Sequence, residues 1–250
     1  MTTCLIHGVP ETAAVWDRVA PLLDHQPLVR LSPPGFGAPL PPGFTATIEE
    51  YRRWLITELE RFDQPVHLLG HDWGAVHAVN VAMTRPELVR SWVGDVLGLF
   101  DQDYRWHDLG QVWATPGDGE DAIKAMIEPS VAQRAASLID GGMHGDVALS
   151  VAEGQNADMG DSILRLYRDA IQPVMARLGD GLERAAARPG LSILASDDHL
   201  AGTDEQRGRA STRAGAQIAV LDGLGHWWFT QDLREAAAVI NQFWTTLAER

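Results

Sequence analysis

The chain has 250 residues, of which 45% are hydrophobic and 22% are charged, so we expect a folded globular protein rather than a disordered one. Its 34 acidic and 20 basic residues give a formal net charge of -14, which argues against a nucleic-acid binder and against adhesion to an anionic membrane. The single cysteine, Cys4, excludes an intramolecular disulfide and a cysteine-based zinc site. Neither a secretory signal nor an apolar stretch of about 20 residues is visible, so the sequence predicts a cytoplasmic protein.

Short apolar runs alternate with helical patterns in the first part of the chain. The run at 3–6 is continuously apolar and ends at His7, which is typical of a strand buried on both faces. Thr47 and Glu50 form a capping box that opens a helix. The predicted strands lie at 3–6, 26–31, 66–69 and within 88–97, and the predicted helices at 13–23, 47–61 and 73–84. Strands separated by helices require crossover connections and therefore predict a mainly parallel sheet.

The alternation stops at about residue 98 and resumes at about residue 191. The intervening part shows helical pieces but no clear strand, at 120–127, 130–139 and 162–178. Two further strands at 191–195 and 217–221 and a last helix at 230–247 follow. The sequence thus predicts an α/β core formed by residues 1–97 and 191–250, with a helical cap, residues 98–190, inserted after the fourth strand.

Polar residues with catalytic potential follow four of the predicted strands. In open parallel sheets, ligands bind outside the carboxyl ends of the strands. The four segments are His7-Gly8-Val9-Pro10, Gly70-His71-Asp72-Trp73-Gly74, Asp197-Asp198 and Gly225-His226. The second has the form Gly-x-Asp-x-Gly, in which two glycines permit a sharp strand-to-helix turn that exposes the middle side chain.

Asp72 occupies the position where such a turn usually carries a serine nucleophile. A carboxylate is already ionised at neutral pH and suits attack on an sp³ carbon that bears a leaving group. The resulting ester must then be hydrolysed by a water that a histidine activates. The structural alternative for Asp72 is a helix N-cap. The chain order of Asp72, a later acid and His226 favours catalysis, because it is the order of nucleophile, acid and histidine in α/β-hydrolases.

These motifs resemble the α/β-hydrolase superfamily and, within it, the branch of epoxide hydrolases and haloalkane dehalogenases. The resemblance covers nearly the whole chain in order, including the position of the cap. It implies that Asp72 is the nucleophile, that His226 is the general base and that Asp198 orients His226, with Asp197 as the alternative acid. The family's opening antiparallel hairpin has no counterpart before the first strand, so we expect six strands.

The resemblance also assigns the substrate-binding groups. An oxyanion hole would use the backbone N–H groups of Val9 and Trp73, next to His7. An epoxide needs a proton donor for its oxygen, for which the cap residues Tyr167 and Tyr104 are the candidates. A halide instead needs indole or amide N–H donors, which Trp73 and two cap tryptophans, Trp106 and Trp113, offer. Where many dehalogenases carry a halide-binding Asn, this chain has Val9, and cap-core packing is the alternative role for the cap tryptophans and tyrosines.

The leading expectation is a cofactor-independent hydrolase that converts an epoxide to a vicinal diol through an Asp72 ester. The alternatives are a haloalkane or haloacid dehalogenase, and a non-hydrolytic biosynthetic enzyme or binding protein of the same fold. We expect no cofactor and no metal, a small apolar organic substrate, no nucleic-acid or membrane partner, and a monomer or homodimer.

Overall fold

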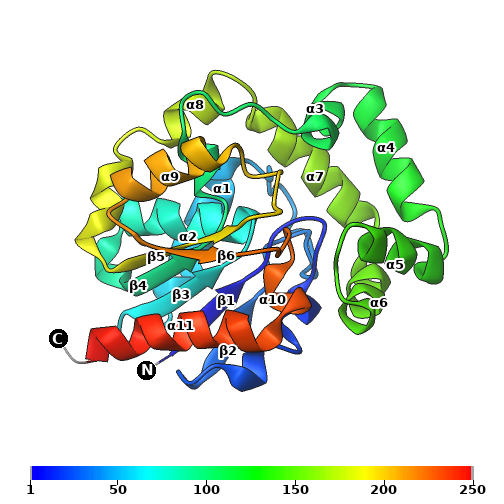
Figure 1. Ribbon diagram of the computed structural model, residues 1–250. Helices are drawn as coiled ribbons and strands as arrows, with labels where there is room; N and C mark the ends of the chain where they lie inside the picture. Colours follow the sequence, from blue (N-terminus) through cyan, green and yellow to red (C-terminus); the bar gives the residue numbers. More distant parts are fainter. Residues whose placement is uncertain (1, 249–250) are drawn as a thin grey trace.

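A six-stranded parallel sheet forms the centre of the computed structural model, which describes residues 2–248 (Figure 1). Its strands are β1 (Thr3–Ile6), β2 (Leu28–Leu31), β3 (Val66–Gly70), β4 (Val89–Gly94), β5 (Gly190–Ala195) and β6 (Gln217–Leu221). They lie in the order β2-β1-β3-β4-β5-β6, and every neighbouring pair is parallel. The α/β class and the six strands expected from the sequence are confirmed.

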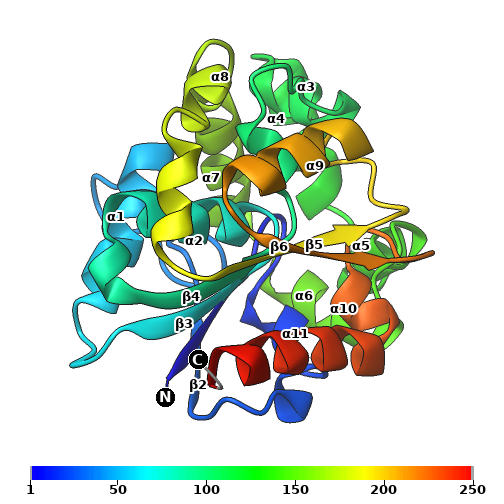
Figure 2. The same ribbon diagram turned by 60° about the vertical axis from the view of Figure 1, so that its left-hand side comes forward.

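Helices cover both faces of the sheet (Figure 2). On one face lie α1 (Ile48–Leu59), α2 (Trp73–Thr84) and α9 (Asp204–Arg213), whose apolar residues share one core cluster. On the other face lies α11 (Leu233–Ala248), with Trp244 in a second cluster. Because both faces are covered, β1 and β3 are buried at every residue, which explains their continuous apolar sequences.

All regular secondary structure in the segment between β4 and β5 is helical, as the sequence predicts. It contains α3 (Asp108–Ala114), α4 (Asp118–Ile127), α5 (Val131–Asp140), α6 (Gly145–Gly154), α7 (Ala157–Asp169) and α8 (Val174–Leu178). Within this segment, two short 3-10 helices stand before and after the α-helices, η4 (Leu97–Phe100) and η5 (Leu182–Ala187). Another 3-10 helix, η3 (Pro86–Leu88), precedes β4. Helices α3 to α6 lie beyond the carboxyl ends of the strands, over the loops that carry the polar motifs (Figure 1). None of the helices within residues 2–248 is both long and apolar enough to cross a membrane.

Three predicted helices are wrong in their extent. Residues 13–23 form two 3-10 turns, η1 (Ala13–Trp16) and η2 (Ala20–Leu22), because Pro21 cannot donate the backbone hydrogen bond of a continuous helix. Residues 162–178 belong to two helices, α7 and α8, which are separated by a segment that ends at Pro173. The last helix is divided into α10 (Trp228–Gln231) and α11, because the Asp232 carboxylate caps the first N–H groups of α11. Helices α3 and α6 were not predicted.

The two glycines of the turn between β3 and α2 are required by close packing. A Cβ on Gly74 would lie 2.1 Å from the carbonyl oxygen of Ile6, and one on Gly70 would lie 2.5 Å from the backbone of Ala75. Neither glycine has a positive φ, so the conformational freedom expected from the sequence is not their role. The left-handed residue of the turn is Asp72 itself, with φ 49° and ψ -125°.

Replacing Gly74 by Ala is expected to destabilise the fold by about 3 kcal/mol, the upper range for an overpacked core, because the obstacle is backbone of β1. Gly208→Ala is the matched control. A Cβ there meets no atom within 4 Å in the middle of α9, so this change should stabilise the protein by up to about 1 kcal/mol. Urea unfolding of both variants measures the difference, and equal stabilities would contradict the packing argument.

Candidate active site

Asp72 lies at the sharp turn between β3 and α2, with its side chain beyond the carboxyl end of the sheet. A non-glycine residue at this φ and ψ stores of order 1–3 kcal/mol of strain, which persists only where the surroundings enforce it. Here the Asp72 backbone N–H donates to Asp95 Oδ1 at 3.0 Å. Although Asp72 stands at the N-cap position of α2, its side chain makes no capping hydrogen bond. Its side chain therefore does not act as a helix cap, although the residue occupies the capping position.

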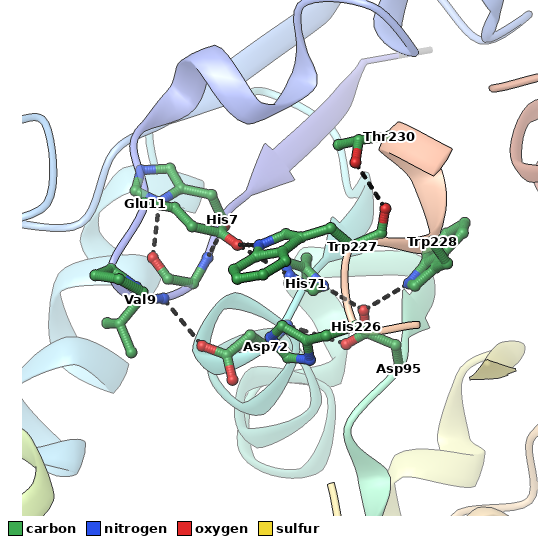
Figure 3. Close-up of polar contacts among 12 residues, drawn as sticks. His7, Val9, Glu11, His71, Asp72, Asp95, His226, Trp227, Trp228 and Thr230 are labelled. Carbon is green, nitrogen blue, oxygen red and sulfur yellow. Dashed lines mark hydrogen bonds and ion pairs between the residues drawn. The ribbon is translucent and has the colours of Figure 1, made fainter. Parts of the chain in front are cut away.

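The loop after β1 presents a backbone donor to the Asp72 carboxylate. The N–H of Val9 donates to Asp72 Oδ2 at 2.9 Å (Figure 3). This approach depends on Gly8, because a Cβ there would lie 2.3 Å from the same oxygen. The Val9 N–H thus stabilises negative charge on Asp72, and it is placed to stabilise an oxyanion derived from this group.

His226 follows β6 and pairs with an acid that follows β5. Its Nδ1 lies 3.0 Å from Asp198 Oδ2, and both residues are buried. The alternative acid, Asp197, is exposed and accepts from the hydroxyl of Ser196. Asp198 also accepts from the backbone N–H of Leu200 at 2.9 Å, which fixes the carboxylate. The structure therefore brings Asp198, and not Asp197, to His226.

Burial and charge act in opposite directions on the pKa values of these groups. Burial alone would lower the pKa of His226, but the Asp198 carboxylate and its hydrogen bond raise it above 6.5. Burial would raise the pKa of Asp198, yet His226 lowers it overall. Burial raises the pKa of Asp72, although the charges of His226 and His71 and the Val9 N–H act against it. The pair of His226 and Asp198 is therefore suited to accept a proton.

A second set of buried charges lies directly behind the candidate nucleophile (Figure 3). His71 Nδ1 lies 2.5 Å from Asp95 Oδ2, and His71 Nε2 lies 3.0 Å from Glu11 Oε1. All three side chains are almost completely inaccessible to solvent. Burial disfavours a charged imidazole, but the two carboxylates hold the pKa of His71 well above its usual range. His71 is thus an imidazolium between two carboxylates.

Two tryptophans from the loop after β6 bind the same carboxylates. Trp227 donates its indole N–H to Glu11, and Trp228 donates to Asp95 Oδ2 at 2.9 Å. Glu11 and Asp95 were not predicted from the sequence, and His71 was named there only as part of the turn motif. A usable signal was present, because Asp95 directly follows β4 and Glu11 directly follows the His-Gly-Val-Pro segment, both at carboxyl ends of strands.

The residues that could face a metal ion are Glu11, His71 and His226, whose ligand atoms lie within 4.8 Å of one another. A metal requires the free lone pair of a neutral imidazole. Both ring nitrogens of His71 lie against carboxylates, and its raised pKa keeps it protonated. The charges of this set therefore match an internal ion-pair network and do not fit a metal.

A cavity of about 110 Å³ separates the catalytic groups from the cap. Asp72 and His226 line it from the core, and Trp106, Trp113 and Tyr167 line it from the cap. The Tyr167 ring packs against Trp106 with centroids 4.6 Å apart and against Trp113 with centroids 4.9 Å apart. Burial and the negative charge of Asp72 raise the pKa of Tyr167 well above its usual range, so its hydroxyl stays protonated.

The other expected substrate-binding residues differ in what their polar groups contact. The Tyr104 hydroxyl donates to the carbonyl of Leu200 at 2.9 Å, and the Trp106 indole N–H donates to the carbonyl of Ala170 at 2.8 Å, so both donors are engaged. The Trp73 N–H is buried and has no hydrogen-bond partner among residues 2–248, and the Trp73 ring lies edge-on to the Tyr167 ring with centroids 5.9 Å apart. His7 lies behind the loop, with its Nδ1 3.0 Å from the carbonyl oxygen of Gly8.

Several solved structures share this fold at low sequence identity. One is described as a candidate epoxide hydrolase from Pseudomonas aeruginosa, in a mutant form, with a TM-score of 0.75 and 20% identity over 99% of this chain and 88% of that one. Another is a haloalkane dehalogenase, DbeA, from Bradyrhizobium elkani USDA94, with a TM-score of 0.66 and 19% identity over 98% and 91% of the two chains. Likeness at this identity establishes the fold.

A curated relative and a family profile extend the comparison to sequence. The (E)-2-((N-methylformamido)methylene)succinate hydrolase of Acinetobacter baylyi is 31% identical over 88 residues, which is 34% of each chain. The match thus spans about a third of that relative. The profile of the alpha/beta hydrolase family matches residues 5–239, which include the turn at Asp72, the acid Asp198 and His226. The chain belongs to the alpha/beta hydrolase family.

Proposed function

We propose that this hydrolase opens an epoxide through a covalent ester on Asp72. The observation that carries the proposal is the position of the Asp72 carboxylate. It lies on a strained turn, its Oδ2 is held by the Val9 N–H, and it shares a cavity with His226. A carboxylate fixed in this way can attack carbon directly, without a base to activate it.

In the first step an Asp72 oxygen forms a bond to a ring carbon of the epoxide. The ring C–O bond breaks, and its electron pair moves to the epoxide oxygen, which accepts a proton from the Tyr167 hydroxyl. In the second step neutral His226 removes a proton from water as the water oxygen adds to the ester carbonyl. The Val9 N–H stabilises the oxyanion. The tetrahedral intermediate then collapses: the C–O bond to the product breaks, and the leaving alkoxide takes the proton from the His226 imidazolium to give the diol. The Asp72 carboxyl group that remains loses its proton to the Tyr167 phenolate, which restores the Asp72 carboxylate, neutral His226 and the Tyr167 hydroxyl.

Tyr167 supports the epoxide over other leaving groups. An alkoxide is a poor leaving group, so ring opening needs an O–H donor, and Tyr167 is the tyrosine that lines the cavity with Asp72. The Trp73 side chain packs against Tyr167 and acts to lower the pKa of the Tyr167 hydroxyl against the effect of burial, which favours proton donation.

Carbon–halogen cleavage is the second candidate, and Trp73 favours it. Its buried N–H has no hydrogen-bond partner among residues 2–248, so a halide that reached it could take this hydrogen bond. The Trp106 N–H is committed to Ala170 and would not assist unless that bond broke.

His226→Gln is expected to form the Asp72 ester but not to hydrolyse it, because the attacking water loses its base. Mass spectrometry should find the substrate mass added to the peptide that contains Asp72, whereas Asp72→Ala should show neither adduct nor turnover. In heavy-oxygen water, a single turnover of the wild-type enzyme should give unlabelled diol. Solvent label in that first product, with no adduct, would show that Asp72 is not the nucleophile.

Tyr167→Phe is expected to slow epoxide opening roughly 100-fold or more with little change in binding, because the lost hydrogen bond strengthens only as charge develops on oxygen. Tyr51→Phe is the control, since the Tyr51 hydroxyl donates to the Pro34 carbonyl, outside the cavity. Single-turnover rates with styrene oxide and with a bromoalkane distinguish the two candidate reactions. Halide release that survives in the variant, together with no diol from the wild type, would support the dehalogenase.

Asp198→Asn is expected to move the acidic limb of the kcat profile to lower pH. His226 must be neutral to act as a base, and Asp198 raises the pKa of His226 above its usual value of 6.5. Hydrolysis is therefore lost as the pH falls through this raised pKa. Without the carboxylate the pKa of His226 falls, while the plateau rate also drops because the imidazolium is no longer stabilised. Asp197→Asn is the control, and the assignment of the acid is wrong if that variant moves the limb instead.

A further inference from the structure

A second cavity of about 320 Å³ adjoins the one that contains Asp72. Most of its lining comes from the helices α3, α4 and α5, whose places in the fold are shown in Figure 1. Pro10, Leu109, Trp113 and Trp227 line both cavities and form the boundary between them. Leu109 is 48% exposed, so this outer chamber also reaches the surface.

The sizes of the two cavities indicate how a substrate is divided between them. Small-molecule sites generally enclose about 300–1,000 Å³. The inner cavity, at about 110 Å³, holds only the reacting part of such a molecule. The outer chamber has the remaining volume, and most of its lining is apolar, including Ala122, Met126 and Leu138. A substrate that uses both cavities is elongated, with an apolar body.

Two polar side chains in the outer lining have unused hydrogen-bonding groups. Arg134 donates through Nη1 and Nη2 to the carbonyls of Ile127, Pro129 and Ala152, while its buried Nε has no partner. Gln155 is 5% exposed, and its Nε2 donates to the Pro10 carbonyl, which leaves the buried Oε1 without a partner. Both residues meet at the Ala152 carbonyl, to which the Gln155 backbone N–H also donates.

Arg134 differs from many other arginines of the chain in lacking an acidic partner. Within residues 2–248 no carboxylate forms an ion pair with it, and its three acceptors are neutral carbonyls. A buried or half-buried charge is costly unless it is paired. The guanidinium thus retains capacity for an anion, and a carboxylate matches both its charge and its geometry.

We propose that the outer chamber binds the carboxylate of an elongated substrate through Arg134, while its reactive carbon lies at Asp72. The unused oxygen of Gln155 accepts from a hydroxyl or a water that accompanies this carboxylate. The position of the reactive carbon rests on the proposed function, but the carboxylate site does not. The substrate class is therefore an apolar chain or ring system with an acidic group remote from the reacting carbon.

Calorimetric titration with hexanoate, octanoate and decanoate, each against its primary amide, tests this site without turnover. The wild-type protein is expected to prefer one or more of these carboxylates over the amide by about ten- to hundredfold, the usual effect of a hydrogen bond to a charged group. Arg134→Met should abolish the preference. Arg165→Met, which removes the same charge from an exposed site on α7 outside both cavities, should retain it. Equal binding of acid and amide, or a preference that survives Arg134→Met, would overturn the proposal.

A second pair of variants keeps the test valid if Arg134→Met fails to fold, since Arg134 ties three carbonyls together. Ala125→Trp fills the outer chamber and leaves the Arg134 contacts intact, so it should weaken carboxylate binding at least tenfold. Ala132→Trp, on an exposed part of α5 outside the lining, should not. Repeating the titrations in Asp72→Ala separates the two proposals, because carboxylate binding should persist there whether or not Asp72 is the nucleophile.

Discussion

The active-site loops of this hydrolase are held together by one buried imidazolium. His71, at the end of β3, is bound on one side by Asp95 from the end of β4 and on the other by Glu11 from the loop after β1. The indoles of Trp227 and Trp228 attach the loop after β6 to the same carboxylates. Four segments that are distant in sequence thus converge on His71, and removing this imidazole would leave two buried carboxylates without a counter-charge, at a cost of about 3–5 kcal/mol.

The strained turn depends on this network. Asp95 binds the His71 ring through Oδ2, and through Oδ1 it accepts from the backbone N–H of Asp72. The Asp95 carboxylate therefore fixes both the His71 ring and the backbone of Asp72, the left-handed residue of the turn. From the opposite side the loop that contains Glu11 supplies the Val9 N–H to the Asp72 side chain. Glu11 also accepts from the Gly8 N–H at 3.0 Å, so the loop that presents the Val9 N–H is positioned by the same charges.

The sequence was sufficient for those features that local patterns determine. Short apolar runs predicted the six strands, and the resemblance to α/β-hydrolases pointed to Asp72, His226 and either Asp198 or Asp197 at the carboxyl ends of the strands, of which the structure brings Asp198 to His226. It failed where a tertiary contact overrides a local pattern. Asp232 divides the last helix by capping α11, and Pro21 divides an apolar stretch whose periodicity favoured one helix. It also gave no indication that Gly74 is needed for contact with Ile6, because that contact joins residues far apart in the chain.

Two histidine rings lie 4.7 Å apart in this site, and their surroundings give them opposite roles. His71 is held between two carboxylates, and loss of its proton would leave both negative charges buried without compensation. The two carboxylates therefore hold the pKa of His71 well above its usual range. His226 has one carboxylate partner, Asp198, and its other ring nitrogen is free for the cavity that contains Asp72. The positive charge of His71 lowers the pKa of His226 and thus opposes the effect of Asp198. His226 therefore releases a proton more readily than His71 does. The difference in the number of acidic partners thus favours the charged form of His71 more strongly than that of His226.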